Sequence, residues 1–344
     1  MKKTVTFGEI MLRLKSPGHE RLFQSPALEA TFGGGESNVA VSLSCFGRQT
    51  KFVSVVPDNP IGNSALNELR KHGVDVSSVK YAGNRLGIYF LETGANQRPS
   101  KVVYDREGTG ISQAKPEDFD WKEIFRDTDW FHITGITPAL SQSAADTSLE
   151  AVAAARKAGV TVSIDLNYRK KLWKYGVSAP QVMSKLAQYA DVIIANEEDI
   201  QLCLGIAAED VDVTTGKLSE DAYRDLAAKV KDQYPNVSIV AITMRESISA
   251  DKNGWSAALA GKTGFYVSQR YAMDDIIDRV GGGDSFSAAI IFGLTEYPND
   301  EAQALRFAVA ASALKHSIPG DFNLITRDEA ENLASGDGSG RVQR

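Results

Sequence analysis

Three consecutive glycines followed by an aspartate, Gly281 to Asp284, are the part of this sequence best suited to chemistry. They precede an apolar run, Ser285 to Leu294, that is typical of a buried helix. Peptide N–H groups at a helix N-terminus attract anions, and glycine lets a phosphate approach the backbone unobstructed by a Cβ atom. Asp284 would accept the proton of a hydroxyl attacking a phosphoryl group, while the amides of Gly281, Gly282 and Gly283 stabilise the developing charge. The segment predicts phosphoryl transfer, although a simple helix-capping acid would give the same pattern.

The composition excludes several other classes of protein. The chain has 344 residues, enough for one large α/β domain or two, and its 38 basic and 44 acidic residues give a net charge of −6. No basic field is therefore available for nucleic acid or for an anionic membrane surface. The N-terminus has no long apolar segment, no stretch is long and apolar enough to span a membrane, and Cys45 and Cys203 are the only cysteines. We expect a cytoplasmic protein with reduced thiols.

The order of apolar and polar residues predicts the scaffold. Short β-branched runs alternate with amphipathic helical stretches, a pattern typical of a parallel sheet with crossover helices. The fold class is therefore α/β, with a doubly wound, mostly parallel sheet. The predicted strands lie near Val5 and at 51–55, 130–134, 161–165, 192–195 and 238–243, and the predicted helices include 36–46, 61–72, 144–158 and 220–231.

Two segments interrupt this alternation, at about 11–32 and 86–106. Within the second, Gly87–Glu92 and Lys101–Asp105 are typical of the strands of a hairpin. A small sheet built from both segments would project from the core as a lid that excludes water from a ligand, although ordinary surface hairpins would give the same pattern. We expect residues 1–333 to form one domain carrying this lid, and the glycine-rich tail at 334–344 to be disordered.

Three other patterns fail the test for a P-loop, a dinucleotide-binding turn and a zinc site, respectively. Gly261-Lys262-Thr263 ends like a P-loop but lies between two strand-like runs, which favours a hairpin turn. Gly33 to Asn38 fails the dinucleotide-binding pattern because Asn38 occupies the place of its last glycine. The four histidines lack metal-ligand spacing, so a zinc site is not expected.

Nearly the whole chain resembles the ribokinase-like (PfkB) carbohydrate kinases. The two signatures of that family have counterparts here in Gly33-Gly34-Gly35-Glu36-Ser37-Asn38 and in Asp278 to Asp284, which reads Asp-x-x-Gly-x-Gly-Asp. The resemblance implies a ribokinase-like fold, with Gly34, Gly35 and Asn38 contacting sugar hydroxyls and Asp284 as the catalytic base. The glycines at 33–35 also suit a tight strand-to-helix turn, and both roles are compatible.

A third counterpart is Asn196-Glu197-Glu198-Asp199, which follows the predicted strand at 192–195. It resembles the Asn-Glu-x-Glu element of the family, which implies that Asn196 lies near the nucleotide and that Glu197 and Asp199 act on Mg²⁺ through water. Magnesium retains most of its waters and asks for few direct carboxylates. Acids in the first turn of a helix are also favourable for its dipole, so spacing alone leaves both interpretations open. The resemblance implies ATP and Mg²⁺ and leaves a monovalent-cation requirement open.

Several side chains favour a sugar acid over a neutral sugar. Arg13 stands where many neutral-sugar kinases of this family have an aspartate, and arginine binds a carboxylate through two parallel hydrogen bonds. Tyr89, Tyr104 and Arg106 on the inserted strands, together with the element Asp165-Leu166-Asn167-Tyr168-Arg169, resemble the members of the family that act on 2-keto-3-deoxygluconate. That resemblance implies substrate contacts by Tyr89, Tyr104, Arg106 and Arg169, with Asn167 and Arg169 near the phosphates. We also expect Asp321, in Pro319-Gly320-Asp321, to approach the substrate. Arg106 and Arg169 would otherwise be solvated surface charges.

The nucleotide side departs from the family pattern. A glycine-containing loop is expected after the last long strand, but the chain reads Thr243-Met244-Arg245-Glu246-Ser247, with no glycine until Gly254. We expect Thr243 and Arg245 to approach the phosphates, together with Gly281 and Gly283. Small residues at 308–312 suit packing beside an adenine or, equally, packing between helices.

These observations predict an ATP-dependent kinase that phosphorylates the 6-hydroxyl of 2-dehydro-3-deoxy-D-gluconate, with Asp284 as general base. A fructokinase or other neutral-sugar kinase is the alternative, and a non-catalytic sugar-binding protein is a more distant one. The expected partners are the sugar acid and ATP, and neither nucleic acid nor a membrane. The exposed edges of an inserted sheet also predict a homo-oligomer.

Overall fold

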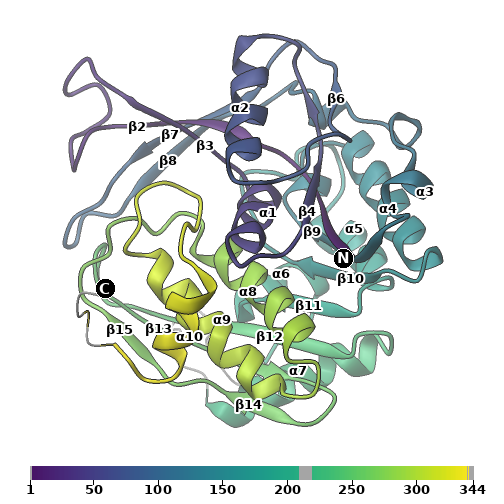
Figure 1. Cartoon of the computed structure of the whole chain (residues 1–344), viewed down its shortest axis with the longest axis vertical. Helices are drawn as coiled ribbons and strands as arrows, with labels where there is room; N and C mark the ends of the chain where they lie inside the picture. The colour runs from purple at the N-terminus through teal and green to yellow at the C-terminus, as the bar shows by residue number, and fades with distance from the viewer. Residues whose placement is uncertain (1, 209–218, 339, 341–344) are drawn as a thin grey trace.

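A mixed sheet of nine strands is the centre of the computed structural model, which describes residues 2–208, 219–338 and 340 (Figure 1). Its strands are β1 (Lys3–Phe7), β4 (Thr50–Val53), β9 (Thr128–Thr134), β10 (Thr161–Asp165), β11 (Val192–Ala195), β12 (Ile239–Ser247), β13 (Asn253–Ala260), β14 (Phe265–Val267) and β15 (Tyr271–Met273). Their order is β14-β13-β12-β11-β10-β9-β1-β4, with β15 beside β13. The run from β12 to β4 is parallel and β13 is antiparallel to β12. The predicted parallel core is confirmed.

Helices cover both faces of this sheet because successive residues of a strand point to opposite faces. Phe131 and Ile133 of β9 share one hydrophobic core with α4 (Gln142–Lys157), α5 (Ala179–Ala187), α6 (Glu197–Leu204) and α7 (Glu220–Gln233). Trp130 belongs to the opposite core, with α1 (Gly35–Cys45), α8 (Gly282–Glu296), α9 (Glu301–Lys315) and α10 (Arg327–Ala334). The remaining elements are α2 (Pro60–Lys71), α3 (Trp121–Ile124), the strands β5 (Val55–Val56) and β6 (Lys80–Tyr81), and the 3₁₀ turns Ile111–Gln113, Pro116–Asp118 and Thr137–Ala139. This is the doubly wound arrangement that the sequence predicts.

A second, smaller sheet projects from the body at the upper left of Figure 1. It has the order β3-β2-β7-β8, from β2 (Met11–Lys15), β3 (Glu29–Gly33), β7 (Gly87–Glu92) and β8 (Lys101–Asp105). The hairpin strands β7 and β8 have the predicted bounds. On the inner face, Met11, Tyr89 and Leu91 pack with Val280, which immediately precedes the glycine run. We call this sheet the lid, and it lies over the N-terminus of α8.

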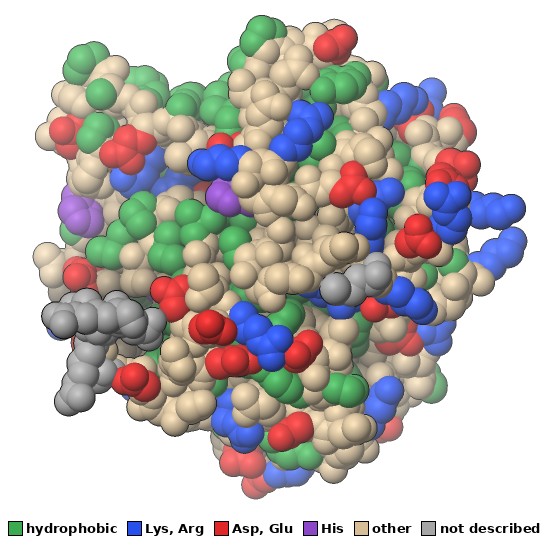
Figure 2. Space-filling model, in the orientation of Figure 1, with side chains coloured by type: hydrophobic (Ala, Val, Ile, Leu, Met, Phe, Trp, Pro, Cys, Tyr) green, Lys and Arg blue, Asp and Glu red, His purple; other side chains and the backbone are tan. Residues whose placement is uncertain are grey.

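The surface carries charges of both signs. On the face drawn in Figure 2, acidic and basic side chains are interspersed over the body and the lid. Among the described residues, no helix has the length and apolar character to cross a membrane. The Gly261-Lys262-Thr263 segment is the predicted turn between β13 and β14, closed by a hydrogen bond from the Gly261 amide to the Gly264 carbonyl at 2.8 Å. The predicted tail falls partly on residues 339 and 341–344, which lie outside the described residues.

Candidate active site

The two glycine-rich segments meet at Asp284. The Asn38 side-chain amide, on α1, donates a hydrogen bond to Asp284 Oδ2 at 2.6 Å, across 246 residues of sequence. Asn38 is itself held by its Oδ1, which accepts from the Gly34 amide at 3.1 Å. A Cβ atom on Gly35 would lie 3.8 Å from Asp284 Oδ1. Glycine at the start of α1 therefore leaves the carboxylate open on that side.

The three glycines before Asp284 serve different structural purposes. Gly281 has a left-handed backbone with φ of 82°, and a Cβ there would lie 2.1 Å from the Asp321 carbonyl oxygen. A Cβ on Gly282 would lie 2.7 Å from the His316 ring. Gly283 is exposed, and a Cβ there would meet nothing within 4 Å. The Gly282 amide donates to the Arg279 carbonyl at 3.3 Å. The first N–H groups of a helix have no acceptor within it, so the open space beside Gly283 suits an anion.

Burial gives Asp284 the pKa of a general base. It raises the pKa of this carboxyl to about 6, while the hydrogen bond from Asn38 and the charge of Arg169 oppose the shift and Asp321 adds to it. A base is most effective when its pKa lies near the working pH, because it is then ionised yet still accepts a proton readily. Asp284 is half-buried, so a hydroxyl can reach it.

Other carboxylates lie close to Asp284 at the carboxyl ends of β10 and β11. Asp165 is buried and accepts from the Ser287 hydroxyl at 3.1 Å, and burial together with Asp199 and Asp284 holds its pKa well above the ordinary range. Burial also raises the pKa of Asp199 to about 6. These acids disfavour one another's ionisation, so a cation placed among them would relieve their repulsion.

Backbone contacts and backbone conformation position the predicted residues around these carboxylates. Asn196 caps α6, where its Oδ1 accepts from the Asp199 amide at 2.7 Å, and Asp199 in turn accepts from the Tyr168 amide at 3.2 Å. Asn167 is buried with φ of 36°, a left-handed conformation that asparagine tolerates. Arg169 is exposed, and its charge lowers the pKa of Asp165, Asp199 and Asp284. Its Nη1 donates to the Tyr168 carbonyl at 3.0 Å.

The donor set fits Mg²⁺ held through water. The described residues hold no cluster of three acidic, histidine or cysteine side chains arranged to bind a metal directly. Glu197 is half-buried, and burial together with the neighbouring Glu198 raises its pKa while Arg245 lowers it. Carboxylates of this kind, beside Asp199, suit an ion that keeps several of its waters and takes its remaining ligands from phosphate.

Strand β12 differs from the prediction. The sequence places its end at Thr243, followed by a nucleotide-binding loop, but the strand continues to Ser247 because 244–247 pair with 253–256 of β13. Thr243 donates a hydrogen bond to the Ala195 carbonyl at 3.4 Å, and Arg245 is exposed on the strand. The expected loop is therefore a strand that runs beside the start of α6.

The small residues at 308–312 are buried in the packing of α9 against α8. Ala308 and Ala311 are fully buried, and the Ser312 hydroxyl donates to the Gly282 carbonyl at 2.7 Å. This stripe forms helix packing, the second of the two interpretations open from sequence.

The lid contributes three of the predicted substrate contacts. Tyr89 is buried, its hydroxyl lies 2.6 Å from both Asp321 carboxylate oxygens, and its ring centroid lies 6.0 Å from that of Tyr104, which is 38% exposed. The Arg106 guanidinium lies 5.3 Å from the Tyr104 ring centroid and forms a buried ion pair with Glu9. Arg106 Nε is buried and finds no hydrogen-bond partner in the described part of the chain.

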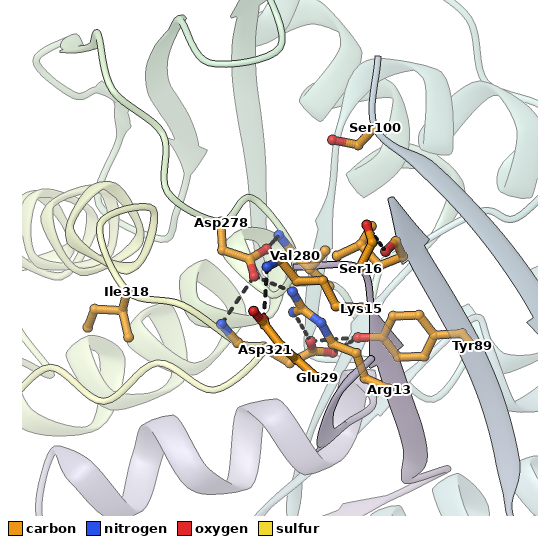
Figure 3. Close-up of polar contacts among 12 residues, drawn as sticks. Arg13, Lys15, Ser16, Glu29, Tyr89, Ser100, Asp278, Val280, Ile318 and Asp321 are labelled. Carbon is orange, nitrogen blue, oxygen red and sulfur yellow. Dashed lines mark hydrogen bonds and ion pairs between the residues drawn. The ribbon is translucent and has the colours of Figure 1, made fainter. Parts of the chain in front are cut away.

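Arg13 has a structural role that the sequence did not predict. Figure 3 shows its guanidinium between Asp278 and Asp321, with Tyr89 on the far side of Asp321. Arg13 is 1% exposed, and its Nη1 donates to Asp321 Oδ1 at 2.6 Å. Two carboxylates neutralise its charge, so Arg13 does not recognise an acid substrate in this arrangement. Beside it, between the lid and the 319–320 turn, lies a cleft of about 480 Å³.

Two further acids of the site were missed. Glu9 pairs with Arg106, and Glu36 anchors the first turn of α1 to the end of β9. Glu36 Oε1 accepts from the Thr134 amide at 3.0 Å and from the Thr137 hydroxyl at 2.9 Å, and burial raises its pKa to about 7. Glu36 lies inside the glycine-rich signature at 33–38, and this position could have marked it as a residue of the site. Nothing in the sequence near Glu9 indicates that it pairs with Arg106.

Comparison with known proteins identifies the family to which the chain belongs. Residues 1–324 match the pfkB family carbohydrate kinases. The chain is 34% identical over 336 residues to the 2-dehydro-3-deoxygalactonokinase of Haloferax volcanii, covering 98% of each chain. It is 29% identical over 334 residues to the 2-dehydro-3-deoxygluconokinase of Bacillus subtilis, covering 96% of this chain and 95% of the relative. The crystal structure of 2-dehydro-3-deoxygluconokinase from Thermotoga maritima superposes with a TM-score of 0.91 at 47% identity, covering 98% of this chain and all of the other. The chain belongs to the pfkB family of carbohydrate kinases.

Proposed function

We propose that this protein transfers the γ-phosphoryl group of ATP to the 6-hydroxyl of 2-dehydro-3-deoxy-D-gluconate, the reaction of a 2-dehydro-3-deoxygluconokinase. One observation carries the phosphotransfer: Asp284 and Asn38 hydrogen-bond at 2.6 Å where the N-termini of α8 and α1 meet beneath the lid. A base with a pKa of about 6 thus stands at the N-terminus of α8, where the space beside Gly283 is open.

The proposed chemistry uses the chain's own residues in distinct roles. Asp284 accepts the proton of the 6-hydroxyl as its oxygen attacks the γ-phosphorus, and the bond from that phosphorus to the ADP oxygen breaks in line. The amides of Gly281, Gly282 and Gly283 stabilise the charge on the phosphoryl oxygens. Arg169 is placed to bind phosphate. Mg²⁺, held through water by Glu197 and Asp199 with Asn196 close by, would shield the negative charge of the nucleotide.

The sugar-acid substrate is supported by the relatives and by the lid. The Haloferax, Bacillus and Thermotoga proteins are named for kinases of 2-dehydro-3-deoxy sugar acids. In this chain we assign Arg106 on the lid to the substrate carboxylate and Arg169 and Arg245 on the body to the phosphates, with Gly34, Gly35 and Asn38 for the hydroxyls. Arg13 no longer contributes to the argument, because Asp278 and Asp321 neutralise it.

Two alternatives remain within the same chemistry. The galactose-derived epimer is favoured by the name of the Haloferax relative. A neutral ketose, as for a fructokinase, would not need the Arg106 guanidinium with its unpartnered Nε. A non-catalytic sugar-binding protein would not need a base at Asp284.

The test is ADP release from MgATP over a panel of 2-keto-3-deoxygluconate, 2-keto-3-deoxygalactonate, fructose, ribose and gluconate. We expect kcat/KM to be highest for the 2-keto-3-deoxy acids, with the ratio between the two epimers assigning the substrate. A preference for fructose or ribose would retain the mechanism and overturn the substrate. Silence over the whole panel would overturn both.

Arg106 offers a sharper test of carboxylate recognition. Arg106→Ala should raise KM for the acid substrate by about 10-fold to 100-fold, because a charged hydrogen bond is worth about 1.5–3 kcal/mol. The weak turnover of fructose should not change. An equal loss on both substrates would show that Arg106 only supports the lid through Glu9.

Two further properties belong to the same proposal. The lid ends in the edge strands β3 and β8, and β8 exposes Val103 and Tyr104, so we infer a homo-oligomer formed through the lid sheet. Sedimentation at two concentrations, with Val103→Lys as the disrupting variant, tests it. A protein that consumes ATP and keeps Cys45 and Cys203 unpaired is expected to act in the cytoplasm.

A further inference from the structure

Lys315 is a buried cation that the proposed chemistry does not use. It is the last residue of α9, its exposed fraction is 0%, and its ammonium donates to three backbone carbonyl oxygens. These are Asp278 at 3.2 Å, Ile318 at 3.2 Å and Gly320 at 2.7 Å. A lysine ammonium has three N–H donors, and here each has a carbonyl acceptor.

Burying a lysine ammonium is unfavourable unless hydrogen bonds and nearby negative charges compensate for the loss of its water. Burial lowers the pKa of Lys315, while Asp278, Asp321 and Asp284 raise it. Lysine is almost never fully buried unless it is paired. Of these acids, Asp278 lies in the loop before α8, Asp321 in the turn after α9, and Asp284 in the candidate active site. Its charge therefore bears directly on the site.

The three carbonyls join the two segments that set the position of the glycine run. Asp278 opens the segment that leads to Gly281, and Gly320 precedes Asp321 in the other. The Asp278 carboxylate bridges them, since its Oδ1 accepts from the Val280 amide at 3.1 Å and its Oδ2 from the Gly320 amide at 3.1 Å. The left-handed Gly281 lies directly against the Asp321 carbonyl. Lys315 lies between these two segments, since its ammonium bonds to the Asp278 carbonyl of the first and to the Ile318 and Gly320 carbonyls of the second. Figure 3 shows Asp278 and Asp321, which belong to the two segments, on either side of the Arg13 guanidinium.

We propose that Lys315 is a positioning residue whose ammonium acts as a built-in monovalent cation. It holds the 278–281 segment against the 318–321 turn, so that the glycine amides and Asp284 face the phosphoryl group. Converging carbonyl oxygens are also the ligands that replace the hydration shell of a potassium ion. Because the side chain already occupies this cage, turnover by this protein does not require an added monovalent cation. The inference rests on the proposed phosphoryl transfer.

The first test uses the unmodified enzyme. Its turnover is measured with saturating MgATP and sugar acid in choline chloride, and then with potassium, sodium or ammonium chloride at constant ionic strength. We expect less than about a 2-fold difference among the salts, because the carbonyl cage is already filled. A several-fold, saturable activation by potassium would overturn the proposal. Absence of turnover in every salt would instead count against the proposed function itself.

The second test empties the cage. In choline chloride, Lys315→Ala should lower kcat by about 100-fold, the typical effect of losing one stabilising group around a transition-state anion. KM for the sugar acid should change much less, since the fully buried Lys315 touches neither reactant. Potassium or ammonium should restore at least about 10-fold of the loss, in a saturable way, by entering the carbonyl cage. Tetramethylammonium, which is too large for the cage, should restore nothing.

A matched control is available on α7. Lys231 also donates to backbone carbonyls, Gly261 at 2.7 Å and Ala260 at 3.4 Å, but these lie at a hairpin away from the site. Lys231→Ala should retain the kcat of the unmodified enzyme in every salt. Unchanged kcat in a folded Lys315→Ala, or a loss that no small cation restores, would overturn the proposal. If Lys315→Ala folds only with potassium or ammonium, as judged by circular dichroism and thermal unfolding, the cation role is supported directly.

Discussion

Replacing Asp284 with asparagine should make the protein more stable and nearly inactive. The asparagine keeps an oxygen that accepts from Asn38, so the local geometry is retained. Loss of a general base lowers kcat by about 10²-fold to 10⁴-fold. In the folded protein the pKa of Asp284 is raised from its ordinary value of 3.8 to about 6, so the folded state binds the proton more tightly than the unfolded state. Stability therefore falls as pH rises through this window.

The size of the gain follows from that shift. Ionised Asp284 lowers the free energy of unfolding by about 3 kcal/mol at pH 7.5 and by about half of that at pH 5. Both are upper values because solvent reaches the half-buried carboxylate. Asp284→Asn should recover the larger part of this at pH 7.5 and roughly half as much at pH 5. Urea unfolding at the two pH values measures the gain, and ADP release measures kcat.

A matched control is Asp328→Asn, which changes an exposed acid in the first turn of α10. Here kcat should not change, and stability should fall slightly, by less than about 1 kcal/mol, because a favourable interaction with the helix dipole is lost. The reasoning is refuted if Asp284→Asn keeps more than a tenth of kcat, or if its stability at pH 7.5 does not exceed that of the unmodified protein.

Three other outcomes follow from the site. Gly283→Ala should fold normally but lose about 100-fold in kcat, because its methyl group enters the space in front of the helix. Gly282→Ala should instead lower the melting temperature, because its methyl group meets His316. Equal melting temperatures for the two variants would contradict this difference. The acid limb of kcat/KM should have an apparent pKa of about 6, set by ionisation of Asp284, and a flat profile from pH 5 to 8 would argue against that base. Arg13→Met should lower the free energy of unfolding by about 3–5 kcal/mol in urea, since it leaves two buried acids uncompensated, and a loss below 1 kcal/mol would count against this.

Local patterns were sufficient to predict the scaffold and the centre of the site. Strands β10 and β11 and the lid strands β7 and β8 have the predicted bounds, because alternating or continuous β-branched runs bounded by turn residues determine them. Both glycine-rich segments were expected at helix N-terminal ends, and the sheet topology then brings Asn38 to Asp284.

What sequence reasoning missed depends on distant partners. Nothing near Arg13 indicates that it pairs with Asp321, 308 residues away, and the pairing of Arg106 with Glu9 spans 97 residues. The extension of β12 to Ser247 depends on β13, whose pairing supplies the hydrogen bonds that a loop would lack. Lys315 belongs to no motif in the sequence, and its role becomes visible only from its burial and from the three carbonyls that its ammonium contacts.

The bond between Arg13 and Asp321 joins an early part of the chain to a late one. During synthesis, the strand that carries Arg13 emerges long before either of its acids, so until then its guanidinium has neither of the carboxylates that neutralise it. Contacts of such high sequence separation form late, because the chain between them must first be ordered. The lid thus acquires its second carboxylate only after residue 321 has been synthesised. A chain released just before that residue would carry both glycine-rich segments and Asp278, but would lack the acid to which both Arg13 and Tyr89 bond.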